Sequence, residues 1–312
     1  MTVTSTQFLA SVQRLIVAPS NQALYTDDDY YAIGDRKTID TVVPLIDNMN
    51  GDYFVRTTEI PMVVDQSEYR LPTRALARKL RDVKIRNSAN IRFDFPKISI
   101  EREQIYQVNG IPFGFYFKGD RFTVVPTPTT TEYSIQYWYF LPPSNLIPYT
   151  DAAVVTGVAG DDVTVNSVPT AISDIFAAGG MVDFIQGTSG NSCLEIDKTI
   201  SNIAGNTITF TTGDVPTDLA SGDFISVAGT SPVVQLPDAA VPYLVTLTCM
   251  DILQAISDFE GYDRLERIAQ KQEKSLKALM EPRIEGEATK IINDFGLINR
   301  GWRGRYWGYS NF

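Results

Sequence analysis

One stretch of the chain, residues 150–235, carries nearly all of its charge imbalance. It holds ten acidic residues and a single base, Lys198, whereas the rest of the chain holds 27 acids against 26 bases. Leu141-Pro142-Pro143 precedes the stretch and Leu236-Pro237 follows it, and such proline punctuation is typical of linkers to an inserted domain. The sequence therefore predicts a frame that is interrupted by a separate acidic module.

The acidic module contains an imperfect internal repeat. Residues 155–187 match residues 199–229, and in each copy a Gly-centred turn joins two alternating strands before a second Gly turn leads into a third. Two such copies can close a core by pairing with one another. We therefore expect a small all-β barrel or sandwich in this module.

The N-terminal part of the frame begins with two predicted helices. Residues 4–18 have an amphipathic pattern. Thr26 is placed to cap a second helix, and the three acids that follow, residues 27–29, suit the positive end of a helix dipole. Three consecutive helical residues diverge by about 100° each, so we interpret them as a capped helix start rather than a cation site. This helix is expected to run to about Met49.

The sequence of the rest of the frame predicts strands followed by helices. Alternating segments rich in aromatic and β-branched residues indicate an antiparallel sheet; they are 53–64, 82–92, 106–117, 121–125 and 133–140. After Pro237, two apolar stripes separated at Gly261 predict two long C-terminal helices. The predicted fold class is α+β, with a helical bundle from the N- and C-terminal helices, an antiparallel β region and an inserted all-β module.

The predicted organisation has four parts. These are an N-terminal frame of helices and β region, the acidic β module, C-terminal helices that complete the frame, and an extended tail. Their ranges are 1–149, 150–235, 236–299 and 300–312.

The composition restricts the chemistry that we expect. The chain has no histidine, the residue most used as a general base near neutral pH and a common ligand for zinc. Its two cysteines, Cys193 and Cys249, support neither a disulfide framework nor a thiolate metal site. The pair Glu101 and Glu103 has no pocket signature around it. We assign no catalytic, cofactor-binding or metal-binding residue, and we predict that the protein is not an enzyme.

Net charge and hydropathy bear on partners and location. The net charge of −10 argues against binding nucleic acid through bulk electrostatics, because phosphate binding needs a basic surface. No apolar run approaches the ~20 residues that a membrane span requires. We expect a soluble protein in a reducing cytoplasm, with no membrane contact.

The C-terminal tail, residues 300–312, is the clearest candidate for a binding segment. It is rich in Arg and aromatic residues, contains no acid, and has three glycines that disfavour regular structure. Such residues are enriched in binding hot spots and also suit stacking on single-stranded nucleic acid. Docking on a protein partner, packing on its own helices and nucleic-acid contact are the three alternatives. The candidate docking residues are Arg300, Trp302, Arg303, Arg305, Tyr306, Trp307, Tyr309 and Phe312.

A resemblance to a known family rests on one motif and on the order of the elements. In residues 59–72, a predicted strand leads through Tyr69-Arg70-Leu71-Pro72 toward a short helix and a further strand at 82–85. This pattern resembles one found in the head-to-tail adaptors of tailed bacteriophages. The order of helices, β region, Pro-Pro, two long helices and tail is also similar, over about 225 residues that exclude the acidic module.

The resemblance implies a structural virion protein. Such adaptors form a ring, usually of twelve copies, that joins the portal protein to the tail and lines the DNA exit path. The tail at 300–312 would dock on the portal, the other face would receive a tail tube or nozzle protein, and DNA would pass through without specific binding. The protein would then be found in the virion neck, and in the host cytoplasm during assembly.

Two other classes of function stay open from the sequence. One is a different neck or tail subunit, such as a stopper, a collar or a nozzle component. The other is a carbohydrate-binding or hydrolytic tail module in which the β repeat would bind the glycan. The resemblance supplies no catalytic residues for such a hydrolase, and no carboxylate pair at a recognisable spacing supports one.

Overall fold

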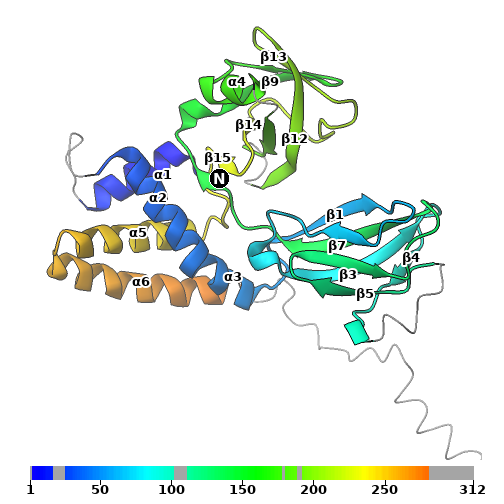
Figure 1. The fold of residues 1–312 in the computed structure, drawn as a ribbon. Helices are drawn as coiled ribbons and strands as arrows, with labels where there is room; N and C mark the ends of the chain where they lie inside the picture. The colour runs from blue at the N-terminus through cyan, green and yellow to red at the C-terminus, as the bar shows by residue number, and fades with distance from the viewer. Residues whose placement is uncertain (1, 17–24, 102–110, 178–179, 188–191, 281–312) are drawn as a thin grey trace, which may run out of the picture.

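The computed structural model describes residues 2–16, 25–101, 111–177, 180–187 and 192–280 of the 312-residue chain. Figure 1 shows three parts: a group of helices, a pair of β-sheets and a β-barrel. None of the helices in these described ranges is both long enough and apolar enough to cross a bilayer.

The helical part combines both ends of the chain. Its main helices are α1 (Ser5–Leu15), α2 (Asp27–Lys37), α3 (Val43–Met49), α5 (Val241–Ala255) and α6 (Phe259–Met280). Apolar side chains from the two ends meet in one core, which includes Phe8, Leu244 and Leu265. The predicted cap of the second helix is confirmed. The Thr26 hydroxyl accepts the Asp29 N–H at 3.3 Å, and the Asp29 carboxylate accepts the Thr26 N–H at 2.7 Å.

The second helix reaches Met49 through a wide turn that the sequence did not predict. A π-helical segment, Thr38–Val42, joins α2 to α3, and the Val43 N–H donates to the Thr38 carbonyl. Pro44 is the second residue after this segment. Proline has no N–H, and its ring crowds the carbonyl four residues before it, so the widened turn relieves a clash that a regular α-helix would meet.

The β region of the frame is a sandwich of two sheets. One sheet has the order β1-β7-β3-β4, with β1 (Val55–Pro61), β7 (Tyr133–Phe140), β3 (Leu80–Asn87) and β4 (Arg92–Asp94). The other has the order β2-β6-β5, with β2 (Glu68–Arg70), β6 (Arg121–Val125) and β5 (Gly114–Lys118). Buried rings from both sheets, among them Phe122, Tyr137 and Tyr139, form the core between them. One sheet alone cannot bury rings of this size, so a second sheet covers them.

The acidic segment forms a closed barrel with the strand order β10-β13-β12-β11-β14-β9. The strands are β9 (Ala153–Ala159), β10 (Asp162–Val165), β11 (Met181–Ile185), β12 (Cys193–Ala204), β13 (Thr207–Phe210) and β14 (Phe224–Val227). The internal repeat maps onto β9-β10-β11 and β12-β13-β14. Exchanging these two triplets leaves every pairing in the barrel unchanged, so each half supplies the edge that the other half needs.

The chain enters and leaves the barrel side by side. The entry linker contains β8 (Asn145–Leu146) and the exit linker contains β15 (Thr230–Ser231), and these pair in parallel. The chain start lies on the exit linker, because the Ser5 N–H donates to the Pro232 carbonyl at 2.7 Å. The linkers are therefore held against the helical part rather than hanging free.

The predicted fold class is wrong. The molecule is not a helical bundle with β parts attached to it, because a closed six-stranded barrel and two facing sheets make up the larger part of its architecture. The single antiparallel sheet is replaced by two sheets. The inserted module is not all-β either, since helix α4 (Thr170–Ala177) lies between β10 and β11.

Candidate functional site

The predicted docking residues of the C-terminal tail lie outside the described residues. Arg300, Trp302, Arg303, Arg305, Tyr306, Trp307, Tyr309 and Phe312 all belong to that segment. Their role as a docking segment stays a prediction, and the candidate site described below comes from other parts of the chain.

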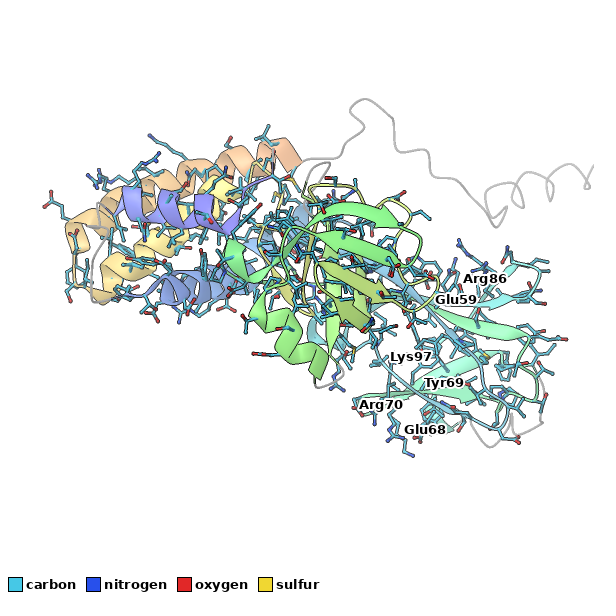
Figure 2. The ribbon with its side chains drawn as sticks, turned by 90° about the horizontal axis from the view of Figure 1, so that it is seen from above. Glu59, Glu68, Tyr69, Arg70, Arg86 and Lys97 are labelled. Atoms are coloured by element: carbon cyan, nitrogen blue, oxygen red, sulfur yellow. The ribbon has the colours of Figure 1, made fainter. Side chains whose placement is uncertain are left out.

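The Tyr-x-Leu-Pro motif positions an arginine at the boundary between sandwich and barrel. Tyr69 is buried, and its hydroxyl accepts the Val63 N–H at 3.0 Å. Figure 2 shows Glu68, Tyr69 and Arg70 together in the sandwich, away from the helices. A short 3₁₀ turn, Leu76–Arg78, follows where the sequence suggested a short helix, because Ala77 has a left-handed φ of 48°. The turn between β2 and this 3₁₀ segment extends Arg74 toward the barrel.

Arg74 joins three separate parts of the molecule. Its guanidinium donates to both carboxylate oxygens of Asp183 on β11, at 2.9 and 2.7 Å. It also donates to Asp197 on β12 at 3.4 Å and to the Ser144 hydroxyl in the entry linker at 3.2 Å. The Asp183 side chain is fully buried and accepts two further backbone N–H groups, from Asp197 and Gly229, each at 2.9 Å. Sandwich, linker and barrel therefore meet at one charged cluster.

The charges at this cluster are well compensated. Desolvation alone would lower the pKa of Arg74, but the carboxylates of Asp183 and Asp197 outweigh it and raise the pKa above its ordinary value. Arg74 is therefore permanently charged. A buried carboxylate that accepts bonds from an arginine and from two backbone N–H groups is well satisfied, so this geometry holds two parts together rather than preparing a group to exchange protons.

A second arginine fixes the other end of the same boundary. Arg56 on β1 donates to the carbonyls of Cys193 and Leu194 at 2.9 and 2.8 Å, and forms an ion pair with Glu195 at 3.4 Å. Between the two arginines, a cleft of about 560 Å³ lies against β1, β12 and residues 70–74. Both arginines are already engaged, so the polar lining of the cleft consists largely of groups that bond across the boundary.

One of the acids that line this cleft, Glu59, is not suited to donate a proton. Glu59 accepts hydrogen bonds from Ser134 and from Arg86, the latter at 2.6 Å. Figure 2 shows Glu59 and Arg86 next to one another on the sandwich. The Ser134 bond, helped by Arg86, lowers the pKa of Glu59 against the effect of desolvation. The carboxyl therefore stays ionised at neutral pH.

Cys193 lies beside the boundary but has the wrong environment for a nucleophile. Burial raises the pKa of its thiol, and the nearby Asp183 acts in the same direction. Its sulfur accepts the Gln235 side-chain N–H at 3.1 Å. Because the thiolate is the reactive form of cysteine, a raised pKa lowers reactivity. Cys249 is buried in the helical core, and burial raises its pKa to about 12.

An exposed apolar surface lies at the far edge of the sandwich. It consists of large side chains from β4, β5 and the segments beside them, and we call it the apolar edge. Its members are Ile91, Phe93, Ile100, Ile111, Phe113 and Phe117. Phe93 is 46% exposed and Ile111 is 65% exposed. Figure 1 shows β4 and β5 on the side of the sandwich away from the barrel.

Sequence reasoning missed the boundary residues and most of the apolar edge. It did single out Phe113 and Phe117, among aromatic residues too numerous for one sheet face to bury, as candidates for contact with neighbouring subunits. Asp183 gave a weak signal, since it is an acid within the apolar strand Met181–Ile185 and a buried acid needs a partner. Nothing in the sequence identified Arg74 as that partner. Among the described residues, no group of His, Cys, Asp and Glu side chains is arranged to hold a metal ion. No protein-family model and no curated protein matches this chain.

Proposed function

We propose that the protein is a structural subunit of a tailed-bacteriophage virion, an adaptor that assembles as a ring, joins the portal protein to the tail and encloses the DNA exit path. The tail tube or a nozzle protein would bind the opposite face of the ring. The Tyr69-to-Pro72 motif and the order of elements in the frame support this assignment by resemblance.

The observation that carries the proposal is the apolar edge of the sandwich. Single exposed apolar residues are ordinary on protein surfaces, but a group of large ones, here from β4 of one sheet, β5 of the other and the segments beside them, is typical of a contact surface. Phe93 and Ile111 leave much of their side chains in water. Contact with another subunit would remove that apolar surface from water, which stabilises an assembly by about 25 cal/mol for each Å² buried.

The boundary between sandwich and barrel also supports a structural role, because it holds these two parts in a fixed orientation. Arg74 and Arg56 bond to several atoms of the barrel at two ends of one cleft. Two separated attachment points resist rotation of one part against the other better than one does. A part that must hold its orientation within a ring benefits from such a joint.

Deleting residues 300–312 tests the docking role of the tail. The truncated protein should fold normally and be missing from assembled particles, because the segment carries hot-spot residue types that would act on a partner. The measurement is quantitative mass spectrometry of purified particles, with circular dichroism as the control for folding. Incorporation of the truncated protein at the normal level would contradict the docking role.

A density map of the virion neck tests the position of the subunit. If the protein is an adaptor, the map should show a ring directly beneath the portal. Within that ring, the N-terminal segment and the helices of adjacent copies should be in contact. Density at the collar or at the distal end of the tail would replace the adaptor by another neck or tail subunit. Finding no copy of the protein in particles would reject the virion role altogether.

A further inference from the structure

A row of cations lies along the outer side of helix α6. Arg264, Arg267, Lys271 and Lys274 are all exposed, and their spacing of three, four and three residues places them on one side of the helix. We call this row the basic stripe. With a rise of 1.5 Å per residue, it extends over roughly 15 Å.

The basic stripe faces away from the core, and the exposed acids Glu260 and Asp263 lie one turn before Arg264 and Arg267 on the same side of the helix. The buried residues of α6, Leu265, Ala269 and Leu276, occupy the opposite side of the helix. None of the four cations forms an ion pair within the described part of the chain. The next cation, Lys277, does so with Glu273 at 2.5 Å, on the flank of the stripe. In a chain with a net charge of −10, an unpaired row of cations indicates an acidic partner.

The same chain presents a complementary acidic surface at one end of the barrel. Asp161 lies in the turn between β9 and β10, Asp162 is the first residue of β10, and the Gly213 N–H donates to the Asp161 carboxylate at 3.1 Å. We call Asp161 and Asp162 the barrel tip. Within the described ranges, neither of these two acids has a cationic partner, whereas the nearby Asp214 binds Lys198 at 3.0 Å.

The two surfaces cannot meet within one molecule. Figure 1 shows α6 at the lower side of the helical part, and the barrel beyond α1 and α2 on the upper side. Two different complementary surfaces on opposite sides of a subunit produce a head-to-tail contact between copies, and such contacts close into a ring when the rotation permits. The placement therefore matches the contact that a ring of identical subunits needs.

We propose that the basic stripe of α6 docks on the barrel tip of a neighbouring copy, and that this charged contact sets the register of the ring; the inference rests on the proposed ring function. A nucleic acid would neutralise only the stripe and would be repelled by the acidic barrel. A second copy neutralises both surfaces at once. Contacts between exposed charges guide association and weaken as salt screens them.

Charge reversal and charge exchange in the full-length protein test the proposal. One variant reverses the stripe (R264E/R267E/K271E/K274E), a second reverses the barrel tip (D161K/D162K), and a third combines both. The control, R14E/R70E, reverses two other exposed cations that have no ion pair within the described part of the chain. Self-association of each protein is measured by sedimentation velocity and native mass spectrometry at low and high salt, and circular dichroism verifies that α6 remains folded.

The expected result is a pattern across the four variants. The wild-type assembly should weaken at high salt, each reversed surface alone should weaken assembly at low salt by about tenfold or more, and the combined variant should recover most of the loss. The control should behave like the wild type. Reversal of the tip makes the net charge less negative, so a general effect of net charge would strengthen assembly in that variant. Weakening in the tip variant together with recovery in the combined variant therefore requires that the two surfaces touch one another.

Three outcomes would overturn the proposal. The first is assembly that is insensitive to reversal of the stripe, and the second is a combined variant that fails to recover. The third is a stripe variant that loses co-purifying nucleic acid while it assembles normally, which would assign the stripe to nucleic acid. Failure of the wild-type protein to self-associate at any salt concentration, together with its absence from particles, would instead reject the proposed ring function itself.

Discussion

The barrel and the sandwich are both built from antiparallel strands, yet they leave different surfaces to solvent. Every barrel strand has two neighbours, because the two halves of the repeat complete each other's edges. The sandwich ends in short edge strands, and β4 has a single strand partner among the described residues. Large apolar side chains such as Ile91 and Phe93 stay exposed there. A closed sheet hides its backbone and its core, whereas an open one retains surface for contact.

The barrel and the sandwich also differ in their charge. The barrel segment carries nine excess negative charges, and acidic surfaces favour solubility. The sandwich carries mixed charges that are largely paired, such as Arg121 with Glu68 at 2.6 Å and Arg86 with Glu59 at 2.6 Å. The comparison indicates that the sandwich is the part that makes apolar contacts. Any contact through the barrel would then depend on charge.

The largest expected effect on stability is at the boundary between the sandwich and the barrel. Arg74→Ala leaves the buried carboxylate of Asp183 without its cation, so we expect the free energy of unfolding to fall by about 3 kcal/mol. Arg56→Ala is the matched control, since it removes bonds to carbonyls and to the partly exposed Glu195; we expect a loss of about 1 kcal/mol. Urea denaturation measures both. Equal losses for the two variants would show that the buried pair does not dominate the joint.

The next largest effect on stability is expected where the helical part contacts the entry linker. Asp35 on α2 is largely buried, and its carboxylate accepts the Leu146 N–H at 3.0 Å. Burial raises its pKa to about 7, although the Leu146 bond acts in the opposite direction. Between about pH 4 and pH 7, the folded protein therefore holds a proton that the unfolded chain releases. This contribution to stability is present in acid and is lost as the pH rises through 7.

Asp35→Asn should remove that pH dependence. The wild type should lose about 2–3 kcal/mol of stability from this group between pH 5 and pH 8, and the stability advantage of the variant over the wild type should be larger at pH 8 than at pH 5. Thermal unfolding followed at both pH values measures the difference. A variant that is equally stabilised at pH 5 and pH 8 would show that the carboxyl does not titrate in this range.

A smaller effect on stability is expected at the apolar edge. Ile91→Ser/Phe93→Ser/Ile111→Ser changes exposed side chains, so unfolding should shift by no more than about 0.5 kcal/mol for each residue. Assembly should nevertheless be lost, because the apolar contact disappears. The matched control on the barrel is Met181→Ser, at an exposed apolar position that is 49% exposed. If the sandwich variant still assembled as well as the barrel control, the apolar edge would not be a contact surface.

The smallest effect is expected from removing the barrel altogether. The linkers pair beside one another, and Val233 and Val234 beyond them pack in the interior. A short bridge from Ala152 to Ala228 should therefore leave the helical part unchanged, although Arg74, Arg56 and Val233 lose their partners in the barrel. Far-ultraviolet circular dichroism of the shortened protein should retain its helical signal. Loss of that signal would show that the barrel segment is required for folding of the frame.

The sequence predicted features that depend on local patterns. The Thr26 cap depends on residues three positions apart, and the repeat in residues 155–229 specifies pairings that close a small β core. The fold class was not predictable in the same way. Which strands share a sheet depends on contacts between distant residues, such as those of Tyr69 and Tyr137 in one core. The alternation of each strand is compatible with one sheet or with two.

The candidate site was less predictable than the fold, for a related reason. The Arg74 to Asp183 contact joins residues 109 positions apart, and either residue alone resembles an ordinary surface charge. The basic stripe of α6 was visible in the sequence only as a helical spacing of cations. Its outward direction follows from burial of Leu265 and Leu276 on the other side, which the structure supplies.

The helical core also affects the order in which the parts of the protein can fold during synthesis. Phe8 and Val12 near the chain start are buried against Leu244 and Cys249, so α1 leaves the ribosome long before its partners exist. At about 5–20 residues per second, synthesis of the intervening residues takes roughly 10–50 seconds. The sandwich and the barrel can be complete before that time has passed. Helices α1 and α2 then stay with their apolar sides uncovered until α5 and α6 have been made.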